Sequence, residues 1–439
     1  MKKSTLIVVV LAMALGAFVY FYDSKHRVAP PTDEASWKPA FAVKADQITG
    51  LRFASAAGKT AFAKQGNLWQ ITQPVATRAD QASISGIVND LSSAKIRRSF
   101  APTDSLSKYG LAQPAVTIDF QQKGGVEHAI RLGDKDFSGN VVYALIDAAK
   151  DVDLLPVSLL DETDKPLSQL RDRSLFELNN GEIGGITIDD PTGILVVTKK
   201  SSAWEIAKPK EVLADSSAVD SLASALSTDK FTDVVSESPD DLAKYGLTHP
   251  SMSVTAATKG QEFHLLVGKK NGDSYYARDT ARPMIFEISS TVYDALNKKF
   301  FDLRDKSILQ FDPTNVAAVE IHNANGIMQC AQGKDDQWTI LQPVADKGKA
   351  IQSWKIFDPI QNARAKQIYD TPSRAVLAHL AKPAIQVILS GKSGKKTTVD
   401  ISAAVGDRIY VRTTAGPEIY ELNTQILKDL GFKAADLLM

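Results

Sequence analysis

The stretch Tyr109-Gly110-Leu111-Ala112-Gln113-Pro114 recurs in the same chain as Tyr245-Gly246-Leu247-Thr248-His249-Pro250. Gly permits a positive φ, Leu supplies an apolar side chain for a core, and Pro forces the residue before it into an extended conformation. The stretch therefore predicts a structural turn that leads into a strand, rather than a ligand-binding loop. A third version, Ala378-His379-Leu380-Ala381-Lys382-Pro383, keeps only the Leu and the final Pro.

A second motif precedes the first: a tryptophan followed five residues later by a proline. It occurs three times, as Trp69/Pro74, Trp204/Pro209 and Trp338/Pro343. The period of roughly 135 residues is far above the 20–50 of solenoid repeats and is the size of a domain. Each Trp lies in an alternating strand between apolar neighbours, so we expect it to anchor a core, with its indole N–H bonded to a backbone acceptor.

The chain length agrees with this repeat count. At 439 residues, a prior of about 150 residues per domain gives close to three domains. The predicted organisation is a transmembrane signal anchor at 1–22, a Pro-rich tether at 23–45, and repeats at 46–180, 181–312 and 313–439, of which the third is divergent.

Each repeat is predicted to combine alternating strands with one amphipathic helix. Apolar residues at helical spacing follow a capping Asp80 in the first repeat and Asp215 in the second. In the third repeat Pro359 interrupts the stripe formed by Trp354, Ile356, Phe357 and Ile360, so that helix should be kinked or broken. Strands at 116–120, 252–256 and 385–389 alternate with a period of two.

These patterns predict an α+β fold: an N-terminal transmembrane helix followed by three tandem repeats of a mixed, largely antiparallel sheet domain, each with one or two packed helices. Further strands are expected to end at a glycine in each repeat, at Gly133, Gly268 and Gly406.

The N-terminal segment is read as an anchor. An apolar run from Thr5 to Tyr22 spans 18 residues, or about 27 Å as a helix, close to the hydrocarbon thickness of a bilayer. Lys2 and Lys3 favour the cytoplasmic side. The expectation is a single-pass protein of the inner membrane with its bulk in the periplasm or extracytoplasmic space, the alternative being a cleaved signal peptide.

Bulk composition narrows the classes of partner. Lys plus Arg equals Asp plus Glu at 51 each, so no basic excess points to nucleic acid. The cluster Lys95-Ile96-Arg97-Arg98 is expected to be a solvated strand face. Cys330 is the only cysteine, which excludes an intramolecular disulfide and a cysteine-based zinc site; it is expected in a core.

The motifs that resemble metal-binding or phosphate-binding loops are better explained as structural turns. Asp134–Gly139 opens like a calcium loop, but the position of the bidentate Glu is Leu145, so a hairpin turn is expected. Gly391-Lys392-Ser393 lacks the earlier Gly of a phosphate loop and is also read as a turn. The six histidines do not recur between repeats. They are His26, His128, His249, His264, His322 and His379. We therefore predict no catalytic, cofactor-binding or metal-ligating residue.

One charged pair does recur, Arg171/Asp172 in the first repeat and Arg304/Asp305 in the second. A salt bridge at a helix end that orients one domain on the next is the favoured interpretation.

Together, the Trp-x(4)-Pro strand, the amphipathic helix, the Tyr-Gly-Leu-x-x-Pro turn and the closing Leu-Arg-Asp segment resemble a repeat family of unknown function. Its members look like membrane-anchored bacterial envelope proteins, often encoded beside gliding-motility-type ABC transporters. The resemblance covers nearly the whole chain after the tether and is weaker for the third repeat. It implies a partner of the ABC-2-type permease and ATPase class.

The resulting hypothesis is a non-enzymatic, membrane-anchored extracytoplasmic accessory or scaffold protein of an ABC-type export system. An alternative is a module that binds envelope glycan or peptidoglycan, with Tyr275/Tyr276 or Trp37 as aromatic contacts. A hydrolase with a dispersed active site is a further alternative.

Overall fold

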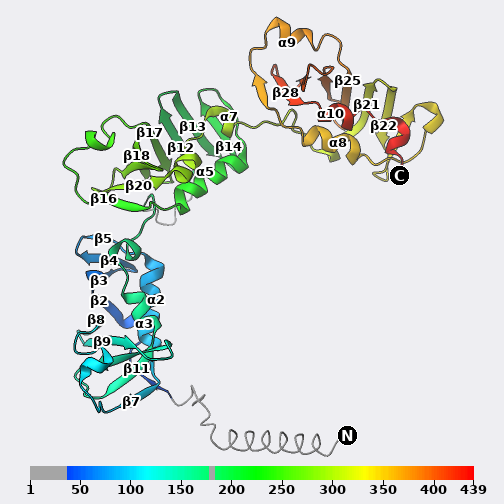
Figure 1. Ribbon diagram of the computed structural model, residues 1–439. Helices are drawn as coiled ribbons and strands as arrows, with labels where there is room; N and C mark the ends of the chain where they lie inside the picture. The colour runs from blue at the N-terminus through cyan, green and yellow to red at the C-terminus, as the bar shows by residue number, and fades with distance from the viewer. Residues whose placement is uncertain (1–36, 177–182) are drawn as a thin grey trace, which may run out of the picture. The chain divides into compact units, whose positions relative to one another are not determined.

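The computed structural model describes residues 37–176 and 183–439; Figure 1 shows it as a ribbon. Three antiparallel sheets follow one another along the chain, and the helices of the described residues are few and mostly short. The chain divides into two compact units. Unit 1 comprises Met1–Leu175 and Lys230–Glu237, and unit 2 comprises Phe176–Asp229 and Ser238–Met439.

The first sheet lies in unit 1 and has nine strands. In spatial order they are β5 (Thr77–Arg78), β4 (Leu68–Gln73), β3 (Gly58–Gln65), β2 (Ile48–Ser55), β8 (Val116–Gln122), β9 (Glu127–Lys135), β10 (Val141–Ile146), β11 (Val152–Pro156) and β7 (Arg98–Phe100). A two-stranded pairing of β1 (Lys38–Pro39) with β6 (Lys95–Ile96) accompanies it. Most neighbours are joined by hairpins, so the sheet is antiparallel throughout its described strands.

The second sheet repeats this order within unit 2. Its strands run β15 (Val212–Leu213), β14 (Ala203–Lys208), β13 (Gly193–Lys200), β12 (Gly185–Asp190), β17 (Met252–Ala257), β18 (Glu262–Asn271), β19 (Ser274–Asp279) and β20 (Ile285–Ser289). The short strand β16 (Asp233–Ser236) has the sequence position of β7 and belongs to the Lys230–Glu237 segment of unit 1.

The third sheet, also in unit 2, has eight strands. They are β23 (Trp338–Gln342), β22 (Gly326–Gln332), β21 (Val316–Asn323), β25 (Ile385–Gly391), β26 (Lys396–Ile401), β27 (Arg408–Thr413), β28 (Ile419–Asn423) and β24 (Gln367–Tyr369). The two-residue strand that ends the other two sheets beyond the Trp strand has no counterpart among these eight. Thus the described sheets share one topology, and the repeat seen in the sequence is a repeat of fold.

One principal helix accompanies each sheet. α2 (Gln81–Ser93) and α5 (Ser216–Thr228) are 13 residues long, and the side chains of Asp80 and Asp215 cap them, as predicted. α8 (Trp354–Gln361) continues through Pro359 but has only 8 residues. The shorter α-helices are α3 (Ser158–Thr163), α4 (Leu167–Leu170), α6 (Ser290–Leu296), α7 (Phe300–Leu303), α9 (Arg374–Ala378) and α10 (Gln425–Asp429).

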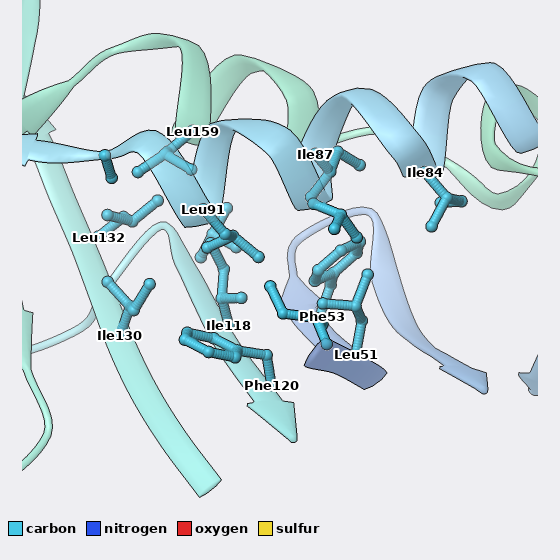
Figure 2. Close-up of a cluster of buried hydrophobic side chains, with 14 of the residues drawn as sticks. Leu51, Phe53, Ile84, Ile87, Leu91, Ile118, Phe120, Ile130, Leu132 and Leu159 are labelled. Atoms are coloured by element: carbon cyan, nitrogen blue, oxygen red, sulfur yellow. The ribbon is translucent and has the colours of Figure 1, made fainter. Parts of the chain in front are cut away.

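The main core of each repeat lies between the helix and one face of the sheet. Figure 2 shows this in the first repeat, where Ile84, Ile87 and Leu91 extend from α2 toward the sheet, whose strand β8 carries Ile118 and Phe120. All five side chains are buried. At about 1.5–3 kcal/mol per large apolar side chain removed from water, this layer is the main stabilising term of the repeat.

A second, smaller core lies on the opposite face of each sheet, because successive residues of a strand point to opposite sides. In the first repeat Leu111 packs there with Leu145 and Val152. Leu247 packs with Ile285 in the second repeat. Leu380 packs with Tyr410 and Ile419 in the third. The leucine of each turn therefore covers the second face of its sheet.

The predicted α+β fold class was wrong. The described chain is mostly antiparallel sheet with few helices, because hairpins rather than helices connect most strands. Among the described residues, no helix has the length and apolar character needed to cross a bilayer. Residues 1–22, to which a transmembrane helix was assigned, and the tether at 23–36 lie outside the described residues.

Candidate functional site

The three recurring tryptophans are core residues. Trp69, Trp204 and Trp338 have exposed fractions of 3%, 2% and 6%. The prolines that follow them, Pro74, Pro209 and Pro343, are all preceded by a cis peptide bond. The expected backbone acceptor is not the one found for Trp204, whose indole Nε1 donates to the carboxylate of Asp220 in α5 at 2.8 Å. This bond links the Trp204 strand to the helix packed on it, and all three tryptophans are buried.

The Tyr-Gly-Leu turn has the structural role that its chemistry predicts. Gly110 and Gly246 have φ values of 71° and 72°, the left-handed conformation that favours glycine. Each turn passes close to a strand glycine: a Cβ added at Gly133 would lie 2.1 Å from the carbonyl oxygen of Tyr109. The same distance separates a Cβ at Gly268 from the oxygen of Tyr245. Pro114, Pro250 and Pro383 then lead into β8, β17 and β25.

The prediction that a strand ends at Gly133, Gly268 and Gly406 was wrong. Gly406 does not end a strand as Gly133 and Gly268 were expected to, since β26 ends at Ile401; β9 and β18 also continue past their glycines. A pair of aromatic rings joins the turn to the sheet in both the first and the third repeat. Tyr109 meets Tyr143 at a ring distance of 5.1 Å, and in the third repeat the ring of His379 stacks on Tyr410 at the same distance.

The remaining motifs with apparent chemistry form turns or isolated pairs. Asp134–Gly139 lies at the β9–β10 hairpin and Gly391-Lys392-Ser393 at the β25–β26 hairpin, as predicted. Lys95, Arg97 and Arg98 are exposed, and Arg97 lies over the ring of Trp37 at 4.7 Å. Within 37–176 and 183–439, no three His, Cys, Asp or Glu side chains lie close enough together to hold a metal ion.

The recurring arginines form the most specific polar contacts that the repeats share. Arg171 donates two hydrogen bonds to the carboxylate of Glu237, at 2.9 and 3.2 Å, within unit 1. Arg304 donates two to Asp370, at 3.0 and 2.8 Å, within unit 2. Both arginines are nearly fully buried, with exposed fractions of 3% and 5%. Bidentate geometry makes such pairs strong and directional.

Each arginine lies in one repeat of the sequence and its acid in the next, so the partners are Glu237 and Asp370 and not the adjacent Asp172 and Asp305 that the sequence suggested. The sequence neighbours Asp172 and Asp305 instead accept hydrogen bonds from the backbone N–H and hydroxyl of Ser174 and Ser307. They therefore shape the backbone at 172–174 and at 305–307. We call each Arg–acid pair, together with the short segment that follows its arginine (172–174 or 305–307), an arginine clasp.

Backbone contacts complete both arginine clasps in the same way. The amide of Phe231 donates to the carbonyl of Arg173 at 2.9 Å, and the amide of Ala365 donates to the carbonyl of Lys306 at 2.8 Å. Isolated β-bridges join Ser174 to Lys230 and Ser307 to Arg364. Each segment thus adds a short piece of backbone pairing to the ion pair.

The two halves of the arginine clasp are distributed unevenly among the repeats. The acids directly follow β16 and β24; after the matching strand β7 of the first repeat the residue is Ala101. An isolated β-bridge also joins Arg171 to Ala79, just before α2. The matching bridge of the third repeat joins Leu438 to Ile351, before α8, so that a leucine takes the place of the arginine. Only the second repeat carries both an arginine and an acid.

Electrostatics favour the ionised pair at the second arginine clasp. Burial opposes ionisation of Asp370, but hydrogen bonds from Arg304 and Lys210 outweigh it and lower the pKa of the carboxyl. Lys210 lies 2.5 Å from the Asp370 carboxylate and 3.5 Å from that of Glu418. The second arginine clasp is therefore a small network of two cations and two anions.

The third repeat also has an open groove between α8 and the C-terminal segment, with a volume of about 530 Å³. Trp354 lines it and is 56% exposed, although its position in the helical stripe predicted a buried residue. The aromatic residues suggested for glycan are less available. Tyr275 stacks on Tyr293 at 3.8 Å, and Tyr276 packs against Tyr245.

Sequence reasoning missed the acids of the arginine clasps and the groove. Both acids could have been found from spacing, because Glu237 follows Arg171 and Asp370 follows Arg304 by the same 66 residues. The groove has no repeated signal, since it occurs where the third helix departs from the pattern of the other two.

Comparison with known proteins places the chain in a family but does not give it a function. No curated protein sequence matches it. Crystal structures of the DNA polymerase III subunit beta and of the DNA polymerase sliding clamp with ligand, both from Pseudomonas aeruginosa, share 8% and 6% identity with it. The alignments cover 88% and 87% of this chain and 94% and 92% of those chains, each with a TM-score of 0.14, too low to indicate a shared fold.

The sequence profile of a domain of unknown function matches residues 69–203 and 204–383, more than half of the chain. Each match begins at a recurring tryptophan, Trp69 or Trp204, and runs on into the following repeat. The chain therefore belongs to the DUF4340 family.

Proposed function

We propose that the protein is a non-enzymatic extracytoplasmic accessory or scaffold protein that works with an ABC-type export system at the inner membrane. The observation that carries this proposal is the arginine clasp. The charged residues that recur between repeats join one repeat to the next, as a scaffold that presents several domains to a partner requires. The class of partner comes from the sequence resemblance to proteins encoded beside gliding-motility-type ABC transporters.

The proposal is tested by recovering the partner. The full chain is tagged, crosslinked in cells and purified from detergent, and the co-purified proteins are identified by mass spectrometry. We expect a permease or an ATPase of the ABC class among them. Recovery of neither from crosslinked cells would contradict the proposal.

A matched pair of variants connects that result to the structure. Arg304→Leu removes the second arginine clasp, whereas Arg52→Ala removes an arginine that is 60% exposed in its side chain. Recovery of the transporter component should fall for Arg304→Leu and stay unchanged for Arg52→Ala. Sedimentation of the wild-type protein with insoluble peptidoglycan would instead favour the glycan-binding alternative.

A further inference from the structure

We propose that the groove beside Trp354 is a docking site for a protein segment that carries a lysine or arginine among apolar side chains. The groove lies wholly in the third repeat. Its volume of about 530 Å³ is within the range of pockets that bind ligands specifically, about 300–1,000 Å³. The inference goes beyond the proposed function, because it names the chemistry of an occupant and depends on no particular transporter.

Part of the lining of the groove, which we call its floor, is apolar and aromatic. Trp354 and Pro359 come from α8, and Phe432 and Leu437 come from the C-terminal segment. Of the five tryptophans in the chain, only Trp354 is exposed; Trp37 is half-buried and the other three are buried. A large exposed aromatic beside other apolar side chains is the composition of an interaction hot spot.

The charged part of the lining, which we call the rim, is mostly acidic. Asp358, Asp429 and Asp436 line it, against the single cation Lys355. Lys355 is held by the carbonyl oxygen of Asp436, to which its ammonium donates at 2.7 Å. The rim therefore has a net negative charge, which is complementary to a basic segment.

The acids of the rim differ in what they already bind. Asp429 accepts a hydrogen bond from the side chain of Gln425, and Asp436 accepts one from the backbone of Lys433. The carboxylate of Asp358 is exposed and has no hydrogen-bond or ion-pair partner within the described part of the chain. Asp358 is thus the rim carboxylate best placed to receive a cation from a partner.

The end of α8 adds to the same potential. Asp358 and Asn362 lie at the C-terminal end of α8, where the helix dipole is negative and favours cations. Pro359 has no N–H to donate to the carbonyl of Lys355 one turn earlier, so this carbonyl lacks its usual helical partner. Lys355 already lies 5.9 Å from the centroid of the Trp354 ring. A cation from a partner would gain charge–charge attraction to Asp358 and the helix end, with its apolar stem against Trp354.

These features favour a basic, partly apolar protein segment over a glycan. A neutral sugar can stack on Trp354, but it gains nothing from three carboxylates and a helix C-terminus. A lysine or arginine side chain uses both parts of the groove, with its methylene stem on the apolar floor and its charge at the rim.

The test uses the full-length protein and a labelled synthetic peptide of about four helical turns, with Leu on one face and Lys on the other. Binding is measured by fluorescence anisotropy. We expect saturable binding that weakens with added salt, no binding of the same peptide with Glu in place of Lys, and much weaker binding of oligolysine, which lacks the apolar face.

Two variants and two controls locate the contact. Trp354→Ala should weaken binding by about 3- to 30-fold through loss of the aromatic face, and Asp358→Asn by about 2- to 5-fold. Phe137→Ala and Asp407→Asn remove an exposed aromatic and an exposed acid elsewhere and should change nothing. Trp354 and Asp358 are exposed, so thermal unfolding should confirm that both variants are folded.

Several outcomes would overturn the inference: no binding of the Leu/Lys peptide, equal binding by Trp354→Ala, or equal binding of oligolysine. Displacement of the peptide by soluble chito-oligosaccharide at similar concentrations would identify a carbohydrate site instead. Because the probe is synthetic, failure here is distinguishable from failure to recover a transporter component.

Discussion

The guanidinium of Arg304 holds the carboxylate of Asp370 by two hydrogen bonds, and the two residues lie 66 positions apart in the sequence. Arg171 and Glu237 repeat this arrangement at the same separation. The two pairs use different acids, Glu and Asp, and keep the bidentate geometry. The contact is therefore a property of the repeat rather than an accident of one surface.

Replacing Arg304 by leucine should weaken the contact between the second and third repeats. Leucine keeps apolar packing but leaves Asp370 with Lys210 alone. Because the side chain of Asp370 is 33% exposed, solvent screens the pair, and we expect a loss of about 1–3 kcal/mol in local stability. Hydrogen exchange of the Ala365 amide, which donates to the carbonyl of Lys306, should become about 5- to 150-fold faster.

The control for this substitution is Arg52→Ala in the first repeat. Arg52 forms only exposed ion pairs with Asp119 and Glu127, so its loss should leave exchange at Ala365 unchanged. Unchanged exchange in Arg304→Leu itself would show that the backbone contacts, and not the arginine, hold the arginine clasp together.

Gly133→Ala should destabilise the first repeat strongly. The added methyl would lie 2.1 Å from the carbonyl oxygen of Tyr109, a backbone atom that cannot rotate away. The turn and the strand would have to separate, at a cost of about 2–4 kcal/mol. Gly86→Ala is the matched control, because a methyl there meets nothing within 4 Å and raises helix propensity, so α2 should gain up to about 1 kcal/mol. Differential scanning calorimetry should show shifts of opposite sign; a neutral Gly133→Ala would contradict the contact.

Asp190 should make the second repeat sensitive to acid. Burial opposes its ionisation, but hydrogen bonds from Lys299 and Thr192 lower its pKa from 3.8 to about 2. A carboxyl whose pKa is lower in the folded state contributes stability above its unfolded pKa and loses that contribution as pH falls through the folded value. We therefore expect about 1–2 kcal/mol to be lost between roughly pH 4 and 2.

The measurement compares wild type with Asp190→Asn over this pH range by thermal unfolding. The stability difference between them should be largest near neutral pH and shrink as the pH falls below 4. Asp189→Asn alters the exposed neighbouring acid and should not reproduce this trend. A difference that is independent of pH would show that Asp190 contributes no ionic stabilisation.

Cys330 should be inert until the third repeat unfolds. It is fully buried in β22, and burial raises the pKa of its thiol to about 12. The thiolate is the reactive form, so a chromogenic thiol reagent at pH 8 should not label the native protein and should label it fully in denaturant. Ser393→Cys, in an exposed hairpin turn, should react at once in the native state. Native labelling of Cys330 would mean that the strand opens readily.

Local patterns in the sequence predicted the parts of the fold that depend on local physics. The burial of Trp69 follows from strand alternation, and the turn at Gly110 follows from the backbone freedom of glycine. The caps at Asp80 and Asp215 were likewise visible in the sequence. These features need only neighbouring residues for their explanation, and they were predicted correctly.

Features that depend on distant residues were not predicted. The partner of Arg304 is set by where β24 ends, and no rule about adjacent residues points to Asp370. Trp354 is exposed at the first position of α8, a helix that is shorter than α2 and α5. The proportion of helix was also misjudged, because hairpins connect most of the described strands.

Arg171 and Arg304 lie at the ends of the first and second repeats, and their acids lie in the second and third. The two ends of each repeat therefore differ in chemistry. A second copy of the middle repeat could be inserted after the first without leaving either partner unmatched. Exchanging the first and third repeats would instead set Leu438 and Ala101 at positions that call for a charge. The order of the repeats is therefore constrained by the charged residues at their ends as well as by the order of the sequence.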